Sequence, residues 1–284
     1  MKLRPIFFCV LFLLTALMMQ AEDYFLLPET FMLHKGETIN VHQFAGQGFE
    51  KDNEYPYQPS RTGELMLYEG KQKIDLTANV KDSTASAFGH QLKNSGLAMI
   101  AMTRKPIDTE IDKTALIAEL DSVGGAKIYD KVNKAGQSKF RIRFTCYMKT
   151  LFTIDKTEGN LFNKELGHTL EIILQQNPYQ LNYGDDMNAT VKFKGKGLAG
   201  AEIDVIIKTA AGTTYPQKLT TDDTGNVYFK LSREGIYLLR LISIQQSVNK
   251  DIDFDKWGAT CTFAFKNTGT LPSTYKEFGL GNKH

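Results

Sequence analysis

Hydrophobic and polar residues alternate along short segments in the second half of the chain. Every second residue is apolar in residues 187–193, and residues 201–205 and 227–231 repeat this pattern. A period of two is typical of a strand that buries one face. Residues 221–225, with the sequence Thr-Asp-Asp-Thr-Gly, have the composition of a tight turn between such strands. Short alternating strands joined by turns predict an antiparallel β-sandwich in this half.

The first half of the chain is also rich in strand patterns. Residues 139–154 predict one long strand, with Phe140 and Cys146 on the same face. Residues 46–60 contain two glycines, two prolines and several charges, which predicts a surface loop. Shorter strands are expected at residues 24–27, 39–41, 65–68, 74–76 and 96–102.

A helical pattern interrupts these strands once. Four apolar residues within 116–123 fall on one stripe at helical spacing, and two glycines follow. Asp108 or Thr109 is the expected cap, so we predict a helix near residues 110–123. A shorter helix is expected at residues 127–133.

These patterns predict a mainly β protein with two antiparallel β-sandwich-like domains and one or two helices in the first. The polar stretch near residues 155–166 is the expected junction between the domains. The predicted parts are a signal peptide at residues 1–21, an N-terminal β-rich domain at residues 22–160, a C-terminal β-sandwich at residues 168–266 and a tail at residues 267–284.

The amino terminus has the layout of a secretory signal. Lys2 and Arg4 form a basic start, residues 6–19 are nearly all apolar, and Ala21 precedes an acidic pair. The alternative is an uncleaved membrane anchor, but an apolar run of 14 residues is shorter than the ~20 that span a bilayer. We therefore expect cleavage near Glu22 and export to the periplasm or the exterior.

Charge and cysteine content narrow the class of protein further. Without Lys2 and Arg4, the 34 basic residues become 32 and equal the 32 acidic ones. A neutral mature chain argues against a nucleic-acid partner. Cys146 and Cys261 remain after cleavage, each on a predicted strand beside phenylalanines, where a thiol behaves as a small hydrophobe. We predict that they are not bridged.

No residue pattern in the chain indicates catalysis. The Gly-x-Ser-x-Gly, HExxH and phosphate-loop motifs are absent, and both remaining cysteines are expected to be buried. The protein is therefore predicted not to be an enzyme. Asp251, Asp253 and Asp255 would suit calcium, but glycine and glutamate are missing from the later positions of a calcium loop. A solvated acidic loop is the preferred interpretation.

Several segments together resemble a family of exported bacterial proteins. They include Asp-Tyr-Phe-Leu-Leu-Pro at residues 23–28, Tyr-Met-Lys-Thr-Leu at residues 147–151 and Asn-Pro-Tyr at residues 177–179. The family is a domain of unknown function described as NikM-like, by analogy with a periplasmic component of nickel or cobalt uptake. The second half also resembles transthyretin-type sandwiches, which implies an immunoglobulin- or transthyretin-like second domain.

The resemblance implies a metal site near the mature amino terminus. Members of the family start with a His-Asp pair, whereas this chain has Glu22-Asp23, and no histidine follows Arg240 in the late strand. The donors that remain are the amino group and carboxylate of Glu22, the carboxylate of Asp23, and His42 on the next strand. Such an oxygen-rich set would hold nickel or cobalt only weakly.

Two functions from different classes follow from the sequence. The first is a non-enzymatic accessory of nickel or cobalt transport that meets a membrane transport component or an outer-membrane receptor. The second is an envelope binding or scaffold module that contacts a protein or a glycan without metal. No segment after the signal has an apolar run of membrane-spanning length.

Overall fold

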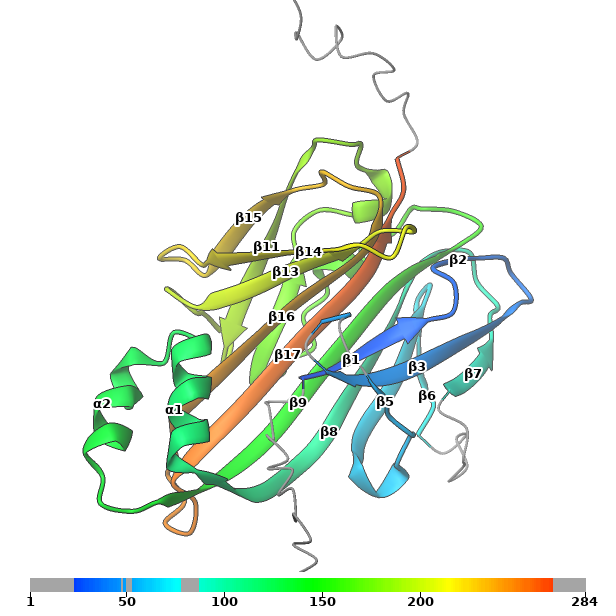
Figure 1. Ribbon diagram of the computed structural model, residues 1–284. Coiled ribbons are helices and arrows are strands. Elements are labelled where there is room, and N and C mark those ends of the chain that lie inside the picture. Colours follow the sequence, from blue (N-terminus) through cyan, green and yellow to red (C-terminus); the bar gives the residue numbers. More distant parts are fainter. Residues whose placement is uncertain (1–22, 47, 50–52, 78–86, 268–284) are drawn as a thin grey trace, which may run out of the picture.

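The computed structural model describes residues 23–46, 48–49, 53–77 and 87–267. Most of these residues form strands, arranged in three sheets, and two α-helices lie at one end (Figure 1). The prediction of a mainly β, sandwich-like fold with one or two helices is confirmed. The predicted signal peptide lies outside the described residues, as does all but the first residue of the predicted tail.

A nine-stranded sheet forms the centre of the molecule. In spatial order its strands are β14 (Thr214–Thr220), β13 (Glu202–Lys208), β16 (Gly235–Gln246), β17 (Phe254–Phe265), β9 (Lys139–Ile154), β8 (Gly96–Asp112), β5 (Thr62–Glu69) and β6 (Gln72–Asp75), and β2 (Met32–Leu33) also pairs with β9. Neighbours are antiparallel, except that β17 and β2 run parallel to β9. Because β9 and β17 come from the two predicted β-rich ranges, those ranges share one continuous sheet.

Two four-stranded sheets cover parts of the central sheet. The first small sheet contains β1 (Asp23–Pro28), β3 (Thr38–Gly46), β4 (Asn53–Glu54) and β7 (Ala87–Gln91). The second small sheet contains β10 (Leu170–Leu174), β11 (Asp186–Phe193), β12 (Lys196–Gly197) and β15 (Asn226–Lys230).

The small sheets pack on opposite faces of the central sheet, as the side chains of β8 demonstrate. Ala98, Ile100 and Met102 join the hydrophobic cluster of the first small sheet, whereas Leu97 and Met99 join that of the second. Successive side chains of a strand point to opposite faces. The two largest hydrophobic clusters are therefore apolar layers separated by the central sheet.

The helices α1 (Lys113–Ser122) and α2 (Ala126–Lys134) connect β8 to β9. The predicted helix start near Asp108 is wrong, because residues 107–112 continue β8 and pair with residues 139–144 of β9. Leu116 and Leu120 of α1 pack in a third cluster with Phe140 and Phe254. Shorter 3-10 turns occupy Pro59–Arg61 (η1), Leu161–Asn163 (η2) and Pro178–Gln180 (η3).

The two cysteines lie on neighbouring strands but on opposite faces. Cys146 of β9 belongs to the layer under the first small sheet, and Cys261 of β17 belongs to the layer under the second. Their thiols point away from each other, so the prediction that they are not bridged is confirmed. Among the described residues, no helix has the length and apolar character needed to cross a membrane.

Candidate functional site

His42 lies on β3 between two carboxylates. Its Nδ1 contacts Glu54, and its Nε2 is 3.0 Å from Oε1 of Glu29. Burial lowers the pKa of His42, but the hydrogen bonds to Glu54 and Glu29 outweigh it and leave this pKa raised. The pKa of Glu29 is lowered by its hydrogen bonds from Asn40 and His42. His42 is thus held as part of a carboxylate–imidazole–carboxylate cluster.

The structure does not bring the predicted metal donors together. Asp23 pairs with Gly46 on β3, whereas His42 pairs with Leu27, four positions further along β1. At the rise of a β-strand this separation is about 13 Å. Glu22 lies outside the described residues.

The contacts of His42 leave no ring nitrogen without a carboxylate neighbour. In the part of the chain that the structure describes, no three histidine, cysteine, aspartate or glutamate side chains are placed to hold a metal ion. Both ring nitrogens of His42 are therefore engaged by Glu29 and Glu54, and not by the backbone-distant Asp23.

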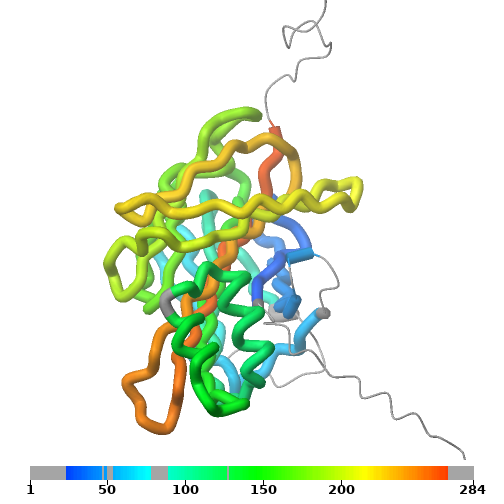
Figure 2. The backbone as a smooth tube through the Cα atoms, turned by 60° about the vertical axis from the view of Figure 1, so that its left-hand side comes forward, coloured from blue at the N-terminus to red at the C-terminus, as the bar shows by residue number. Residues whose placement is uncertain are grey.

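In the acidic segment at residues 251–255, Asp253 forms hydrogen bonds that hold a loop in place. The backbone N–H of Arg141 donates to Oδ2 of Asp253 at 2.7 Å, and the N–H of Asp253 donates to the Arg141 carbonyl at 2.9 Å. Asp251 remains exposed. Asp253 thereby attaches the β16–β17 loop to β9, close to the helices (Figure 2).

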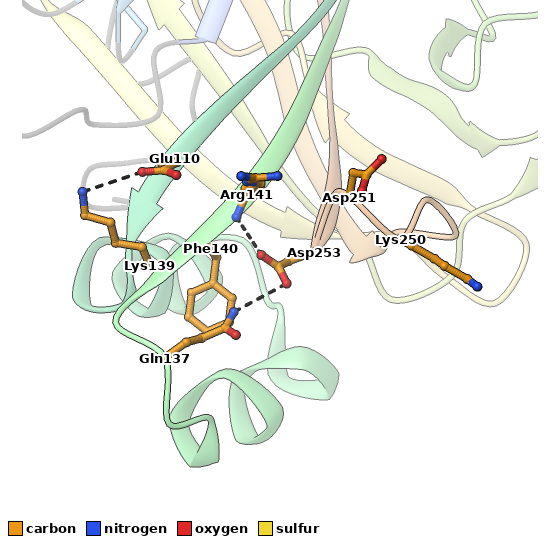
Figure 3. A pocket seen from close by; sticks show the side chains of 8 residues that line it. All are labelled: Glu110, Gln137, Lys139, Phe140, Arg141, Lys250, Asp251 and Asp253. Carbon is orange, nitrogen blue, oxygen red and sulfur yellow. Dashed lines mark hydrogen bonds and ion pairs between the residues drawn. The ribbon is translucent and has the colours of Figure 1, made fainter.

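Two adjoining hollows lie where this loop meets α2 and the ends of β8 and β9; we call them together the end hollow. Their volumes are about 270 and 340 Å³, and Gln137, Phe140, Lys250 and Asp253 line both. Figure 3 shows the lining of the first hollow. The remaining lining residues of the first are Glu110, Lys139, Arg141 and Asp251; those of the second are Lys131, Ala135, Gln246, Ser247, Val248, Asn249, Ile252 and Phe254.

The end hollow has an uneven balance of charge. Lys139 pairs with Glu110 at 3.7 Å, and Asp253 is occupied by the backbone of Arg141. Among the described residues, the side chains of Arg141 and Lys250 form no ion pair or hydrogen bond. The first hollow therefore offers two cationic groups, Arg141 and Lys250, beside the exposed carboxylate of Asp251, and the buried residue Phe140 is part of its lining.

The sequence did not reveal this site because its lining comes from separate segments. The sequence predicts Asp251 and Asp253 only as part of a solvated acidic loop, and it predicts residues 139–154 only as a strand. The segments around residues 110, 137–141 and 246–254 meet because β8, β9 and β17 are neighbours in the central sheet. The residue pattern within one segment does not predict which distant segments lie next to it in the fold.

A buried charged cluster elsewhere is enclosed and holds the fold together. Lys149 contacts Glu171, and each side chain is at most 6% exposed. Glu171 also accepts the backbone N–H groups of Leu166 and Gly167, at 2.7 and 3.0 Å. His168 stacks on Tyr147 with ring centroids 4.6 Å apart. These contacts tie the loop before β10 to the central sheet.

Fold and site together define a layered β protein with an open, polar hollow at one end of its main sheet. The chain belongs to the family described as a domain of unknown function (DUF4198), whose sequence pattern matches residues 19–245. No curated protein matches the chain.

Comparison with solved structures finds weak likenesses among β-domain proteins. A tetra-tandem repeat from the extending region of a large adhesion protein has a TM-score of 0.23 and 10% identity; the match covers 87% of this chain and 50% of that one. The D0-D1 domain of intimin has a TM-score of 0.20 and 10% identity, with 86% and 98% covered. Murine CEACAM1b has a TM-score of 0.21 and 8% identity, with 86% and 100% covered. The chain thus spans half the length of the adhesion-protein structure.

Proposed function

We propose that this protein is a non-enzymatic binding module of the bacterial envelope, which holds an anionic group of a protein or glycan in the end hollow. The observation that carries the proposal is the pair of cationic side chains, Arg141 and Lys250, that have no partner among the described residues. Charge-assisted hydrogen bonds to such groups are roughly twice as strong as neutral ones. The proposed export of the protein and its location in the envelope rest on the signal-like residues 1–21.

The state of the thiols supports the non-enzymatic part of this proposal. Burial raises the pKa of Cys261 to about 12, so its reactive thiolate form is disfavoured. Cys146 is also buried, and its Sγ lies 3.8 Å from the carbonyl oxygen of Tyr24. Neither thiol is exposed at the end hollow.

Co-sedimentation with purified envelope fractions tests the proposed function. The mature protein, starting at Glu22, is mixed with peptidoglycan sacculi or with outer-membrane vesicles, and the bound fraction is measured. We expect binding to at least one fraction, and a loss of roughly tenfold or more in the double variant Arg141→Glu/Lys250→Glu. Lys196→Glu, an exposed charge reversal in the second small sheet, is the matched control. Equal binding by all variants, or none by the wild type, contradicts the proposal.

Metal handling is the second candidate function. It is supported by the resemblance to the NikM-like family and by the clustering of His42 with Glu29 and Glu54. In this case the partner would be a membrane transport component or an outer-membrane receptor. The oxygen-rich donor set predicted from the sequence makes weak or absent nickel and cobalt binding the expected result.

Calorimetry separates the two candidates. Nickel and cobalt are titrated into protein that starts at Glu22 and into its His42→Ala variant. Weak binding that His42→Ala abolishes supports a site that includes His42. Tight binding that survives His42→Ala excludes that site, and no binding at all leaves the envelope-binding function as the better supported one.

A further inference from the structure

Gln43 and Arg104 are two of the polar side chains buried in the layer between the first small sheet and the central sheet. Gln43 of β3 is 0% exposed and Arg104 of β8 is 3% exposed. Gln43 shares a face of β3 with Val41 and Ala45, and Arg104 follows Met102 on the same face of β8. Both side chains therefore point into the apolar layer under the first small sheet.

The guanidinium of Arg104 lies in a corner between two aromatic rings. Its Cζ is 4.1 Å from the ring centroid of Tyr24 and 4.8 Å from that of Tyr55. The two rings are nearly perpendicular, at 80°, with centroids 5.2 Å apart. Aromatic rings stabilise a cation but accept hydrogen bonds poorly, so the N–H groups still require an acceptor.

No such acceptor exists in the part of the chain that the structure describes. Arg104 forms no ion pair or side-chain hydrogen bond there, and its Nη2 is fully buried. An arginine guanidinium carries a positive charge and several N–H donors, and it has no acceptor of its own. A buried charge without a counter-charge is strongly unfavourable. A bound anion would therefore stabilise Arg104 at this position.

The side-chain amide of Gln43 is a second buried polar group in the same layer without hydrogen bonds from the residues that the structure describes. Its Oε1 and Nε2 are both buried and have no hydrogen-bond partner among the described residues. Its carbonyl oxygen accepts the N–H of Tyr55 at 2.7 Å, so the backbone of Gln43 adjoins the residue whose ring contacts Arg104. The amide offers one acceptor and two donors, and buried polar groups in native proteins are nearly always paired.

We propose that Arg104 and Gln43 form a binding site for a small hydroxy-carboxylate, separate from the end hollow. The planar guanidinium donates to the carboxylate oxygens, and Nε2 of Gln43 can add a further donor. Oε1 of Gln43 accepts the hydroxyl of the ligand. Tyr24 and Tyr55 exclude water from the cation.

Thermal denaturation with glycolate and acetate tests this site. The mature protein is melted at pH 7 in sodium glycolate, acetate or chloride of equal ionic strength. We expect both carboxylates to raise the Tm saturably relative to chloride, with glycolate bound about fivefold more tightly because its hydroxyl adds one hydrogen bond. Arg104→Gln should abolish both effects, and Gln43→Leu should remove the preference for glycolate. Arg61→Gln, which changes an exposed arginine outside both proposed sites, is the matched control and should retain both effects.

Gln43→Leu keeps the test decisive if Arg104→Gln does not fold, because leucine suits this apolar layer. The proposal is overturned if neither carboxylate raises the Tm of the wild type, or if the variants respond as the wild type does. It is also overturned if Glu22→Gln/Asp23→Asn lowers the Tm as much as Arg104→Gln and the carboxylates have no effect. That outcome would assign the counter-charge to the amino-terminal residues of the chain itself.

Discussion

At the scale of single residues, burial determines which ionisable groups affect stability. His34 pairs with Asp155 at the surface, with an Nδ1–Oδ1 distance of 2.9 Å, and solvent screens this pair. His168 instead stacks on Tyr147 in a partly buried position. Burial, and then the neighbouring charge of Lys149, lower the pKa of His168 to about 4. Of these two histidines, we expect only His168 to contribute strongly to the pH dependence of folding.

Replacing His168 with phenylalanine should flatten that pH dependence. Between pH 6.5 and 4 the unfolded chain binds a proton at His168 that the folded chain does not. The free energy of unfolding therefore rises with pH through this window, by at most about 1.4 kcal/mol per pH unit for one proton. Phenylalanine retains the stacking on Tyr147 but cannot titrate.

Urea denaturation at pH 5, 6 and 7 measures this effect. The wild type should lose more stability on acidification than His168→Phe. Equal slopes would show that His168 is protonated in the folded state as readily as in the unfolded chain.

At the scale of elements, a single buried ion pair connects β9 to β10. Lys149 reaches across the layer to Glu171 and also donates to the carbonyl oxygen of Ile172 at 3.2 Å. Glu171 holds the loop in front of β10 through two backbone N–H groups. Removing one partner leaves the other charge buried and uncompensated.

Lys149→Met should therefore lower the free energy of unfolding by about 3–5 kcal/mol. The double variant Lys149→Met/Glu171→Leu should lose less than the sum of the single changes, because no unpaired charge remains. Lys230→Met is the control: its pair with Asp186 is exposed, and its loss should cost less than about 1 kcal/mol. Additive effects in the double variant, measured by urea denaturation, would contradict this account.

At the scale of the whole molecule, the parallel pairing of β9 and β17 joins the two halves. Nine residue pairs connect these strands, from Phe254 with Ile142 to Thr262 with Thr150. β9 also pairs with β8 along almost its entire length. Separating the halves would leave β9 and β17 each with an open edge and uncovered apolar faces.

The full chain should consequently unfold in one cooperative transition, and the separate fragments 22–160 and 168–266 should not fold alone. Circular dichroism during urea denaturation of the full chain and of each fragment tests this. A fragment that unfolds cooperatively, at a midpoint close to that of the full chain, would show that the halves are independent domains.

Most strands and turns can be predicted from neighbouring residues in the chain. The strand at residues 139–154 was predicted with the observed bounds, and the turn at residues 221–225 occurs where Gly225 has a φ of +87°. There an added Cβ would lie 2.7 Å from backbone atoms of Val191 and Leu198, so glycine is required. Alternation and turn chemistry depend on neighbours in the chain, which is why the sequence alone reveals them.

Only the tertiary structure decided which elements meet. Strand pairing with residues 139–144 overrode the helical capping signals at Asp108 and Thr109, because backbone hydrogen bonds to β9 extend β8 to Asp112. Contacts between segments distant in sequence also decide three other features. They are the partners of His42, the lining of the end hollow, and the burial of Gln43 and of Arg104. The physical reason is that such contacts follow from the order of strands in a sheet, and a period of two is compatible with many orders.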